Sequence, residues 1–153
     1  MSVVVRPVTA ADAGAVAALL AELGHATDAA DVPARLALVA HDGGAALLAT
    51  DAAGESLGFV SLARHAVIHA PGPVALITGL VVAAAARGRG VGRALVAAAR
   101  AWAEAEGCVR LTVTSAEHRA DAHAFYPACG MAYTGRRFTA SLTTTGSRDA
   151  GHR

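Results

Sequence analysis

The spacing of hydrophobic residues in the first part of the chain changes between strand-like and helix-like patterns. The apolar run Val3–Val5 predicts a short strand, and Thr9–Leu23 predicts a helix because its Val and Leu residues recur every three or four positions. Asp31–Val39 has a capping residue and a proline in its first turn, which predicts a second helix. Two apolar runs, Ala45–Thr50 and Leu57–Arg64, flank a cluster of turn residues and therefore predict a β-hairpin.

The rest of the chain predicts a further succession of strands and helices. Val74–Val82 is almost wholly apolar and predicts a buried strand, and Gly90–Glu106 predicts a long helix with one apolar face. Alternation of apolar and polar residues predicts a strand at Val109–Thr114, and Asp121–Cys129 predicts a shorter helix that ends at a glycine. Two weaker apolar stretches predict the closing strands, Met131–Tyr133 and Arg137–Leu142.

The predicted elements follow one another in the order β-α-α-β-β-β-α-β-α-β-β, without a linker or an internal repeat. This order predicts an α/β fold with a mixed sheet, in a single domain over residues 1–142. Residues 143–153 are polar and predict a flexible C-terminal tail. A chain of 153 residues is long enough to bury a hydrophobic core without disulfides or a structural metal.

The formal charge of the chain is close to zero but unevenly distributed. The 13 basic residues, all arginine, and the 12 acidic residues give a net charge of +1. Residues 1–86 carry three arginines and seven acids, whereas residues 87–153 carry ten arginines and five acids. The small total argues against a nucleic-acid-binding protein that neutralises many phosphates. A local anion site is compatible with the basic half, which begins at Arg87.

The hydrophobic segments predict a cytoplasmic protein without a membrane partner. The longest apolar stretch, Pro73–Ala86, is shorter than the roughly 20 residues that a membrane-spanning helix needs. The N-terminal residues lack the basic leader and long apolar core of a secretory signal. Cys108 and Cys129 have no metal-ligand spacing, and the simplest interpretation is two buried free cysteines in a reducing compartment.

The seven histidines are candidates for a metal site, but their spacing argues against one. Only His65 and His69 are four residues apart, as two ligands on one helix face would be. This pair lies in a predicted loop and has no glutamate between its members, so no metal is expected. His25, in the loop after the first predicted helix, is interpreted as an ordinary loop histidine in preference to a catalytic one.

The segment Arg87–Arg93 predicts a phosphate-binding turn. It follows a predicted buried strand, opens a long helix and contains three glycines in alternate positions, at which the backbone can approach a ligand closely. The first turn of the following helix presents unpaired N–H groups and the positive end of the helix dipole. Three arginines add charge and the multidentate donors that suit phosphate. These arginines are Arg87, Arg89 and Arg93.

Two common phosphate-binding motifs do not fit this segment. A Walker-type loop requires a lysine, and the chain contains none. A dinucleotide-binding GxGxxG motif counted from Gly88 would need glycine in place of Arg93, and counted from Gly90 it would need glycine in place of Leu95. The alternative is an ordinary strand-to-helix turn with solvated arginines. Three glycines and three arginines in seven positions favour the phosphate site.

The same segment resembles the sequence signature of a known enzyme family. Arg87-Gly88-Arg89-Gly90-Val91-Gly92 matches the (Q/R)-x-x-G-x-(G/A) signature of the GNAT (Gcn5-related) N-acetyltransferases, which bind acetyl-CoA. Ala122-His123-Ala124-Phe125-Tyr126, followed by Gly130, is similar to the family's A-x-x-(F/L)-Y-x-x-x-G segment, and Arg136-Arg137-Phe138 resembles its closing strand. The resemblance covers roughly Val3 to Leu142, and the predicted element order agrees with it.

The resemblance implies an acetyl-CoA site built largely from the backbone. The main chain of Leu80–Val82 would pair with the pantetheine arm as an added strand would, and Val82 would lie near the acetyl carbonyl. The amides of Gly88–Arg93 would bind the pyrophosphate. Tyr126 would protonate the departing CoA thiolate, a role that suits a phenol with a pKa of about 10. The residues thereby assigned to acetyl-CoA are Leu80, Val81, Val82, Arg87, Gly88, Arg89, Gly90, Val91, Gly92, Arg93 and Arg119.

Two positions depart from the family pattern. Many members carry asparagine seven residues before the tyrosine, where this chain has Arg119, whose guanidinium could reach a CoA phosphate instead. Many members also carry a carboxylate on the fourth strand, which deprotonates the amine, where this chain has Thr78. Without that carboxylate, the amine would arrive neutral or would lose its proton through water past Thr78 or a histidine.

The resemblance implies an acetyl-CoA-dependent N-acetyltransferase, an enzyme of the transferase class that needs no metal. The expected reaction is direct attack of a primary amine, first of all that of a small molecule, on the thioester within a ternary complex. Protein acetylation at an N-terminus or a lysine side chain, and a non-catalytic acyl-CoA-binding module, are the alternatives. The sequence leaves open the acceptor, the acyl-chain length and the oligomeric state, a homodimer included.

Overall fold

The computed structural model describes residues 2–114, 120–135 and 137–142, with the side chains of residues 120–123 excepted. The chain separates into two compact units, Met1–Thr114 and Ser115–Arg153. The predicted flexible tail, residues 143–153, lies outside the described residues. The prediction of a single domain over residues 1–142 stays a prediction. No helix among the described residues is both long enough and apolar enough to cross a membrane.

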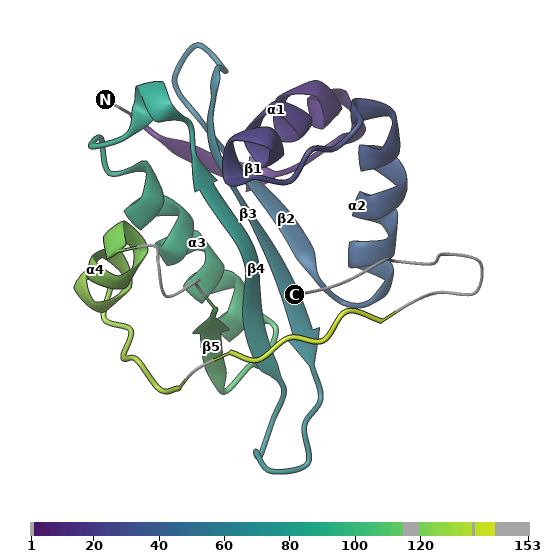
Figure 1. Ribbon diagram of the computed structural model, residues 1–153, viewed down its shortest axis with the longest axis vertical. Coiled ribbons are helices and arrows are strands. Elements are labelled where there is room, and N and C mark those ends of the chain that lie inside the picture. Colours follow the sequence, from purple (N-terminus) through teal and green to yellow (C-terminus); the bar gives the residue numbers. More distant parts are fainter. Residues whose placement is uncertain (1, 115–119, 136, 143–153) are drawn as a thin grey trace. The chain divides into compact units, whose positions relative to one another are not determined.

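The first unit is built on a sheet of five strands, with three α-helices between them in residues 2–114 (Figure 1). The prediction is confirmed to within two residues for all of these elements, if the 3-10 turn before the first helix is counted with it. The elements are β1 (Val4–Pro7), η1 (Ala10–Asp12), α1 (Ala13–Leu23), η2 (Ala29–Asp31), α2 (Val32–His41), β2 (Ala45–Thr50), β3 (Ser56–His65), β4 (Val74–Val82), η3 (Ala84–Ala86), α3 (Val91–Ala105) and β5 (Arg110–Val113).

The strands of the sheet lie in the order β1-β2-β3-β4-β5. The first four strands pair antiparallel, and β4 pairs with β5 in parallel, so the sheet is mixed, as predicted. A parallel pair requires a crossover connection, which α3 supplies between β4 and β5. The connection places the N-terminus of α3 directly after the C-terminal end of β4.

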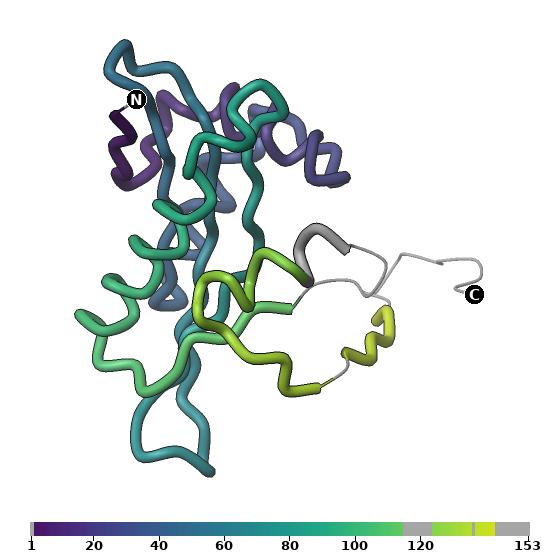
Figure 2. Tube along the Cα trace, turned by 90° about the vertical axis from the view of Figure 1, so that its left-hand side faces the viewer, coloured from purple at the N-terminus to yellow at the C-terminus, as the bar shows by residue number. Residues whose placement is uncertain are grey.

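Helices cover both faces of this sheet. Figure 2 shows α3 on one side of the strands of the first unit and α1 and α2 on the other. Two hydrophobic clusters result, one with Ile77 and Leu95 under α3 and one with Leu48 and Phe59 under α1 and α2. Burial on both faces explains why β4 is a nearly continuous apolar run in the sequence.

Gly58 allows the start of α3 to pack directly on β3. A Cβ atom at this position would lie 2.8 Å from the Val81 carbonyl oxygen, 3.0 Å from Leu95 Cδ1 and 3.2 Å from Val91 Cγ1. The first of these distances is shorter than any ordinary contact of a Cβ atom. A side chain at Gly58 would therefore clash with the backbone of β4 and press on the Val91 and Leu95 side chains of α3.

The N-terminus of the first helical segment is closed by the chain's own side chains. Asp12 closes it, because its carboxylate accepts the Thr9 backbone N–H at 2.8 Å. Arg6 donates two further hydrogen bonds to this carboxylate, at 2.8 and 2.9 Å. The bonds from Arg6, followed by those from Thr9, favour the charged form and hold the pKa of Asp12 well below its ordinary value. Asp28 closes the next turn in a similar way, accepting the Ala30 N–H at 3.0 Å.

The described part of the second unit consists of α4 (Ala120–Ala128) and the chain that follows it. The helix agrees with the prediction to within one residue. Gly130 follows it after Cys129, and its φ of 82° is the left-handed conformation in which helices commonly end.

The predicted closing strands, Met131–Tyr133 and Arg137–Leu142, are wrong. Residues 131–135 and 137–142 form neither strand nor helix. Tyr133, Phe138 and Leu142 are exposed, so these side chains are not covered as the apolar face of a strand would be. A weak apolar alternation becomes a strand only where a neighbouring strand supplies hydrogen bonds and one face is buried.

Candidate functional site

The β4 strand is paired on both sides over its first half and on one side over its second half. Its parallel ladder with β5 runs from the Val74–Arg110 pair to the Ile77–Val113 pair and ends there within the described residues (Figure 1). The antiparallel ladder with β3 continues to the Gly58–Val82 pair. Residues 78–82 therefore have no strand partner among the described residues on the side from which β5 has diverged, and we call this side the open edge of β4.

A β-bulge marks the point at which β4 and β5 separate. Ser61 pairs with Gly79, and Leu62 pairs with Ile77, which leaves Thr78 as the extra residue on β4. The side-chain hydroxyl groups of Thr78 and Ser61 share a hydrogen bond of 2.5 Å. Thr78 is exposed. At the position where many GNAT members carry a carboxylate, this chain thus presents a pair of hydroxyl groups.

Backbone groups of two predicted site residues face the open edge. In an antiparallel ladder, successive residues direct their N–H and C=O groups alternately to one side and to the other. The Ala83 N–H donates to the Leu57 carbonyl of β3 at 2.8 Å. Residues two apart face the same side, so Val81 also faces β3, and Leu80 and Val82 face the open side. Val81 contributes its side chain instead, which is buried in the cluster under α1 and α2.

The loop between β4 and α3 contains two glycines in the left-handed region. Gly88 has a φ of 78° and Gly90 a φ of 80°, and this conformation costs an L-residue about 1–2 kcal/mol. A Cβ atom at either position would meet nothing within 4 Å. The backbone conformation, and not a lack of space, therefore requires glycine. Gly92, the third glycine of the motif, lies in the first turn of α3.

The first turn of α3 directs backbone amides toward the end of this loop. The Ala94 N–H donates to the Gly90 carbonyl at 3.1 Å and is the first ladder bond of the helix. The amides of residues 91–93 precede that bond and have no acceptor within the helix. No described side chain caps α3, and its first turn contains no acidic residue. Among the described residues, no acidic side chain thus neutralises the positive end of this helix dipole, which favours an anion.

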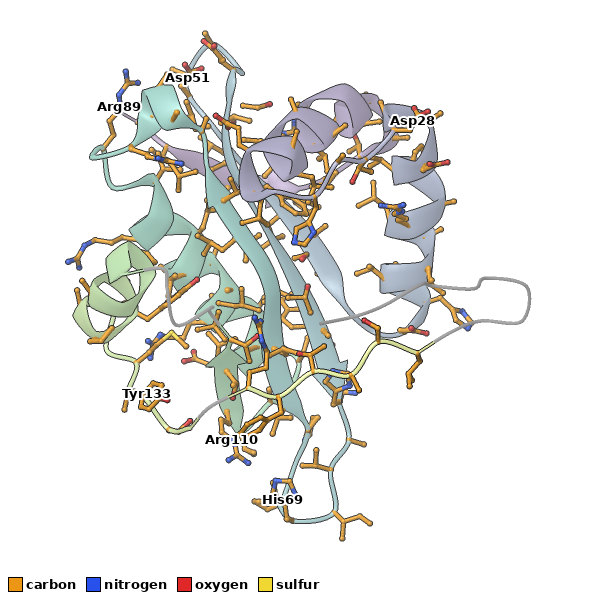
Figure 3. The ribbon with its side chains drawn as sticks, viewed as in Figure 1. Asp28, Asp51, His69, Arg89, Arg110 and Tyr133 are labelled. Carbon is orange, nitrogen blue, oxygen red and sulfur yellow. The ribbon has the colours of Figure 1, made fainter. Side chains whose placement is uncertain are left out.

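The three arginines predicted to bind phosphate surround this helix start. Arg87 follows η3, Arg89 lies between the two left-handed glycines, and Arg93 lies in the first turn of α3. All three are exposed, and Figure 3 shows Arg89 extending outward from the loop. Their guanidinium groups add positive charge to the end of α3 that the helix dipole already makes positive. The arrangement can hold a pyrophosphate.

A carboxylate from α1 contacts the beginning of the same loop. Glu22 accepts the N–H of Ala84, the first residue of η3, at 3.2 Å. Because η3 leads directly into Arg87, this bond connects α1 to the segment that ends at α3. Glu22 could not be identified from the sequence, since the bond joins distant segments and no local pattern signals it. Gly58 did carry a signal, because a glycine within an apolar strand indicates close packing.

Tyr126 and Arg119 belong to the second unit. The Tyr126 side chain lies on α4, is half-buried and packs edge-on against Phe125, with 5.2 Å between the ring centroids. Arg119 lies outside the described residues. The structure thus brings together the predicted site residues of β4, the loop and α3, all in the first unit. The roles of Tyr126 and Arg119 stay predictions.

The histidines are distributed over separate parts of the structure. His65 ends β3, His69 lies in the β3–β4 loop (Figure 3), and His25 follows α1 and is exposed. Among the described residues, no three His, Cys, Asp or Glu side chains lie close enough together to bind a metal ion.

Comparison with solved structures identifies proteins of the same fold. A transcriptional regulator from Bacillus halodurans C-125 has a TM-score of 0.83 at 24% identity, covering 92% of this chain and 100% of that chain. An aminoglycoside 6′-N-acetyltransferase from Acinetobacter baumannii has a TM-score of 0.77 at 19% identity, covering 94% of this chain and 99% of that chain. These likenesses establish the architecture.

Sequence comparison establishes the family. Residues 17–131 match the model of the acetyltransferase (GNAT) family. The chain is 39% identical over 136 residues to an aminoglycoside N(6′)-acetyltransferase type 1 from Stenotrophomonas maltophilia. The aligned region covers 86% of this chain and 88% of that protein. Together with the glycine and arginine motif at the start of α3, these matches show that the chain belongs to the GNAT family and is an acetyl-CoA-dependent N-acetyltransferase.

Proposed function

We propose that this enzyme acetylates a primary amine of a cationic small molecule, by direct attack on acetyl-CoA in a ternary complex. The observation that carries the proposal is the open β4 edge, which leads directly into the uncapped N-terminus of α3. The relative from S. maltophilia is named an aminoglycoside acetyltransferase, which supports an aminoglycoside as the first acceptor to test. The excess of acids over arginines in residues 1–86 also favours a cationic acceptor.

The donor matches this arrangement along its length. Its pantetheine arm carries amide groups, which can pair with the backbone groups of Leu80 and Val82 in the manner of an added strand. Its pyrophosphate suits the amides of residues 91–93 and the guanidinium groups around them. The open edge and the helix start are consecutive in the chain, so one extended ligand can reach both.

The reaction requires one proton to leave the amine and one to reach the CoA sulfur. The neutral amine attacks the thioester carbonyl carbon, the C–S bond breaks, and CoA leaves as the thiol with a proton from the Tyr126 phenol. The proton of the amine passes to water, from which Tyr126 is reprotonated. We assign stabilisation of the oxygen anion that develops on the carbonyl to the Val82 N–H, which faces the open edge.

Thr78 and Ser61 affect how the amine loses its proton. Their hydroxyl groups can relay a proton to water, but they cannot accept and keep one at neutral pH as a carboxylate base does. The amine must therefore be neutral when it attacks or must release its proton to water. We expect kcat/KM to rise with pH up to the pKa of the acceptor amine.

A thiol-release assay with acetyl-CoA tests the proposal. Neomycin, with an amine at the 6′ carbon, and paromomycin, with a hydroxyl there, form a matched pair, and spermidine is a second small-molecule cation. We expect rapid CoA release with neomycin and much slower release with paromomycin. Turnover only of a peptide with a free N-terminus and a lysine would identify a protein acetyltransferase. Binding of acetyl-CoA without release in the presence of any amine would identify a non-catalytic module.

The variant Tyr126→Phe tests the assignment of the acid. It removes the phenol hydroxyl and keeps the ring that packs against Phe125. We expect kcat to fall about a hundredfold, because general acid catalysis contributes a factor of about this size, while the Kd for acetyl-CoA is unchanged. An unchanged kcat would show that another group protonates the thiolate.

A further inference from the structure

A cavity of about 360 Å³ lies between the C-terminal end of α2 and the strands β3 and β4. This volume is at the lower end of the range for small-molecule sites, about 300–1,000 Å³. The described residues that line it are Val39, Asp42, Leu62, Ala63, Arg64, His65 and Thr78, which lie in the first unit.

Asp42 supplies the one carboxylate among these lining residues. It follows the last residue of α2, at the negative end of the helix dipole, and it is exposed. Its carboxylate has no hydrogen-bond or ion-pair partner among the described residues. The Nε of Arg64 donates to the Glu106 carbonyl at 3.3 Å, which directs this guanidinium toward the end of α3. Arg64 and His65 are the other ionisable residues of the lining, so a cation is favoured at the Asp42 end of the cavity and not throughout it.

Thr78 connects this cavity to the open edge of β4. It lines the cavity, and it is also the bulge residue after which β4 continues without β5. A ligand in the cavity therefore lies against the strand residue that precedes the proposed pantetheine edge. Val39 and Ala63 add apolar walls suited to the carbon framework of such a ligand.

We propose that this cavity is the acceptor subsite and that Asp42 binds an ammonium group of the acceptor other than the amine that reacts. The inference rests on the proposed function, because it specifies the acceptor of the same reaction. The amine that attacks the thioester must be neutral, whereas a second amine on the same molecule stays protonated at neutral pH. Asp42 thus makes the enzyme selective for acceptors with two or more amino groups.

Calorimetric titration of neomycin into the full-length protein, without acetyl-CoA, measures the subsite directly. Asp42→Asn removes the carboxylate in the cavity, and Asp31→Asn is the matched control, because Asp31 lies at the opposite end of α2 and does not line the cavity. We expect Asp42→Asn to raise the Kd of neomycin about tenfold, as loss of a charged hydrogen-bond partner does, and Asp31→Asn to raise it less than about twofold. Equal effects of the two variants, or no effect of Asp42→Asn, would overturn the proposal.

Steady-state kinetics with a monoamine add a second test. A glucose derivative with an amino group in place of its primary hydroxyl carries the reacting amine alone and lacks a second ammonium group. We expect Asp42→Asn to raise the KM of neomycin and to leave the KM values of this amino sugar and of acetyl-CoA unchanged. A rise in the KM of both acceptors would show that Asp42 maintains the structure of the site and does not bind a second ammonium group.

A third variant tests the cavity without changing its charge. Ala63→Leu adds volume from β3 and is expected to weaken neomycin binding while the melting temperature stays within a few degrees of that of the wild type. Unchanged binding in this variant, or no binding by the wild type, would overturn the subsite. If the wild type binds neomycin but releases no CoA with any amine, the proposed function fails, and the titrations with Asp42→Asn and Asp31→Asn still decide the subsite.

Discussion

Two helix N-termini of this enzyme differ in what their unpaired N–H groups meet. One belongs to the helical segment that begins at Thr9, and the other to the helix that begins at Gly90. In the first, Asp12 stands three residues after Thr9, and its carboxylate accepts the Thr9 N–H and is neutralised in turn by Arg6. In the second, the residue three positions after Gly90 is Arg93, and no described side chain caps the helix. The same helix position thus carries an acid in one case and a base in the other.

This difference separates a helix end that serves stability from one that serves binding. An acid in the first turn of a helix stabilises it by about 0.3–1 kcal/mol. The start of α3 lacks that contribution, and its amides and dipole are directed outward among exposed arginines. The missing acid is replaced when an anionic ligand binds, so ligand binding and the stability of α3 are coupled.

The largest effect is expected from making the start of α3 resemble that of the first helical segment. Arg93→Asp replaces a guanidinium with a carboxylate at the position that corresponds to Asp12. We expect the Kd of acetyl-CoA to rise about a hundredfold, since a charged hydrogen bond is lost and a repulsion is added. The melting temperature without ligand should be equal to that of the wild type or higher. Calorimetric titration and thermal unfolding measure the two quantities.

Arg93→Ala is the control for this variant, because it removes the guanidinium without adding a negative charge. We expect its Kd to rise about tenfold. If Arg93→Asp bound acetyl-CoA as tightly as the wild type, the pyrophosphate would not lie at the start of α3.

A smaller effect is expected from changing the backbone of the same loop. Gly90→Ala places a Cβ atom on a residue with a φ of 80°, which costs about 1–2 kcal/mol if the conformation is kept. If the loop relaxes instead, the amides of the first turn lose their alignment with the phosphate. We therefore expect a Kd for acetyl-CoA about tenfold higher or a melting temperature several degrees lower. A variant with both quantities unchanged would show that the loop does not require the left-handed conformation.

At the N-terminus of the first helical segment, which Asp12 caps, a substitution is expected to change the stability of the fold and not the binding of acetyl-CoA. Asp12→Asn removes the charge that accepts the bonds from Arg6 and Thr9, and we expect it to lower the free energy of unfolding by about 1 kcal/mol, as loss of a helix cap does. The Kd of acetyl-CoA should not change. Urea unfolding and calorimetric titration of the same samples test the two statements, and a weakened Kd would mean that this end also serves binding.

The pH dependence of stability provides a further test of Asp12. Its pKa is lower in the folded state than in the unfolded state. The contribution of the Asp12 carboxylate to the free energy of unfolding is therefore complete above the unfolded-state pKa of about 3.9. It is lost as the pH falls toward the folded-state pKa. The stability difference between the wild type and Asp12→Asn should accordingly be constant from pH 7 to pH 5 and should shrink below about pH 4. A difference that stays constant down to pH 2.5 would contradict the assignment.

The smallest effect is expected from replacing a glycine of α1 with alanine, the same kind of substitution as Gly90→Ala. Gly14 lies in the helix without a left-handed φ, is exposed, and has nothing within 4 Å of an added Cβ atom. Gly14→Ala should therefore raise the free energy of unfolding by about 0.5 kcal/mol. The substitution is stabilising at Gly14 and harmful at Gly90, and thermal unfolding of both variants in parallel shows the opposite signs. A destabilised Gly14→Ala would imply a contact that the helix geometry does not account for.

Local patterns were sufficient to predict the strands and α-helices of the first unit, but not the 3-10 helices η2 and η3. The buried run Val74–Val82 is bounded by proline and glycine before it and by the arginine motif after it, and β4 occupies the same residues. The amphipathic spacing of α3 and the glycines and arginines at its start are likewise local signals. The phosphate-binding segment could therefore be found without a structure.

Features that depend on two distant segments could not be predicted in this way. The bulge at Thr78 and the end of the β5 ladder at Ile77 are properties of register, which alternation along one strand does not encode. The contact of Glu22 with Ala84 and the cavity that contains Asp42 join residues of separate elements. The closing strands failed for a related reason, since alternation near Tyr133 and Phe138 does not reveal whether a partner strand lies beside it.

The five-residue open edge of β4 has a consequence for handling the protein without its donor. An unpaired strand edge is a template on which a second chain can add a strand, and such addition leads to aggregation. Residues 78–82 are largely apolar, and no proline or charged residue interrupts them. A bound donor that pairs with Leu80 and Val82 would cover this template. The ligand-free enzyme should therefore aggregate faster on storage than the enzyme kept with CoA, and CoA should act as a preservative as well as a product.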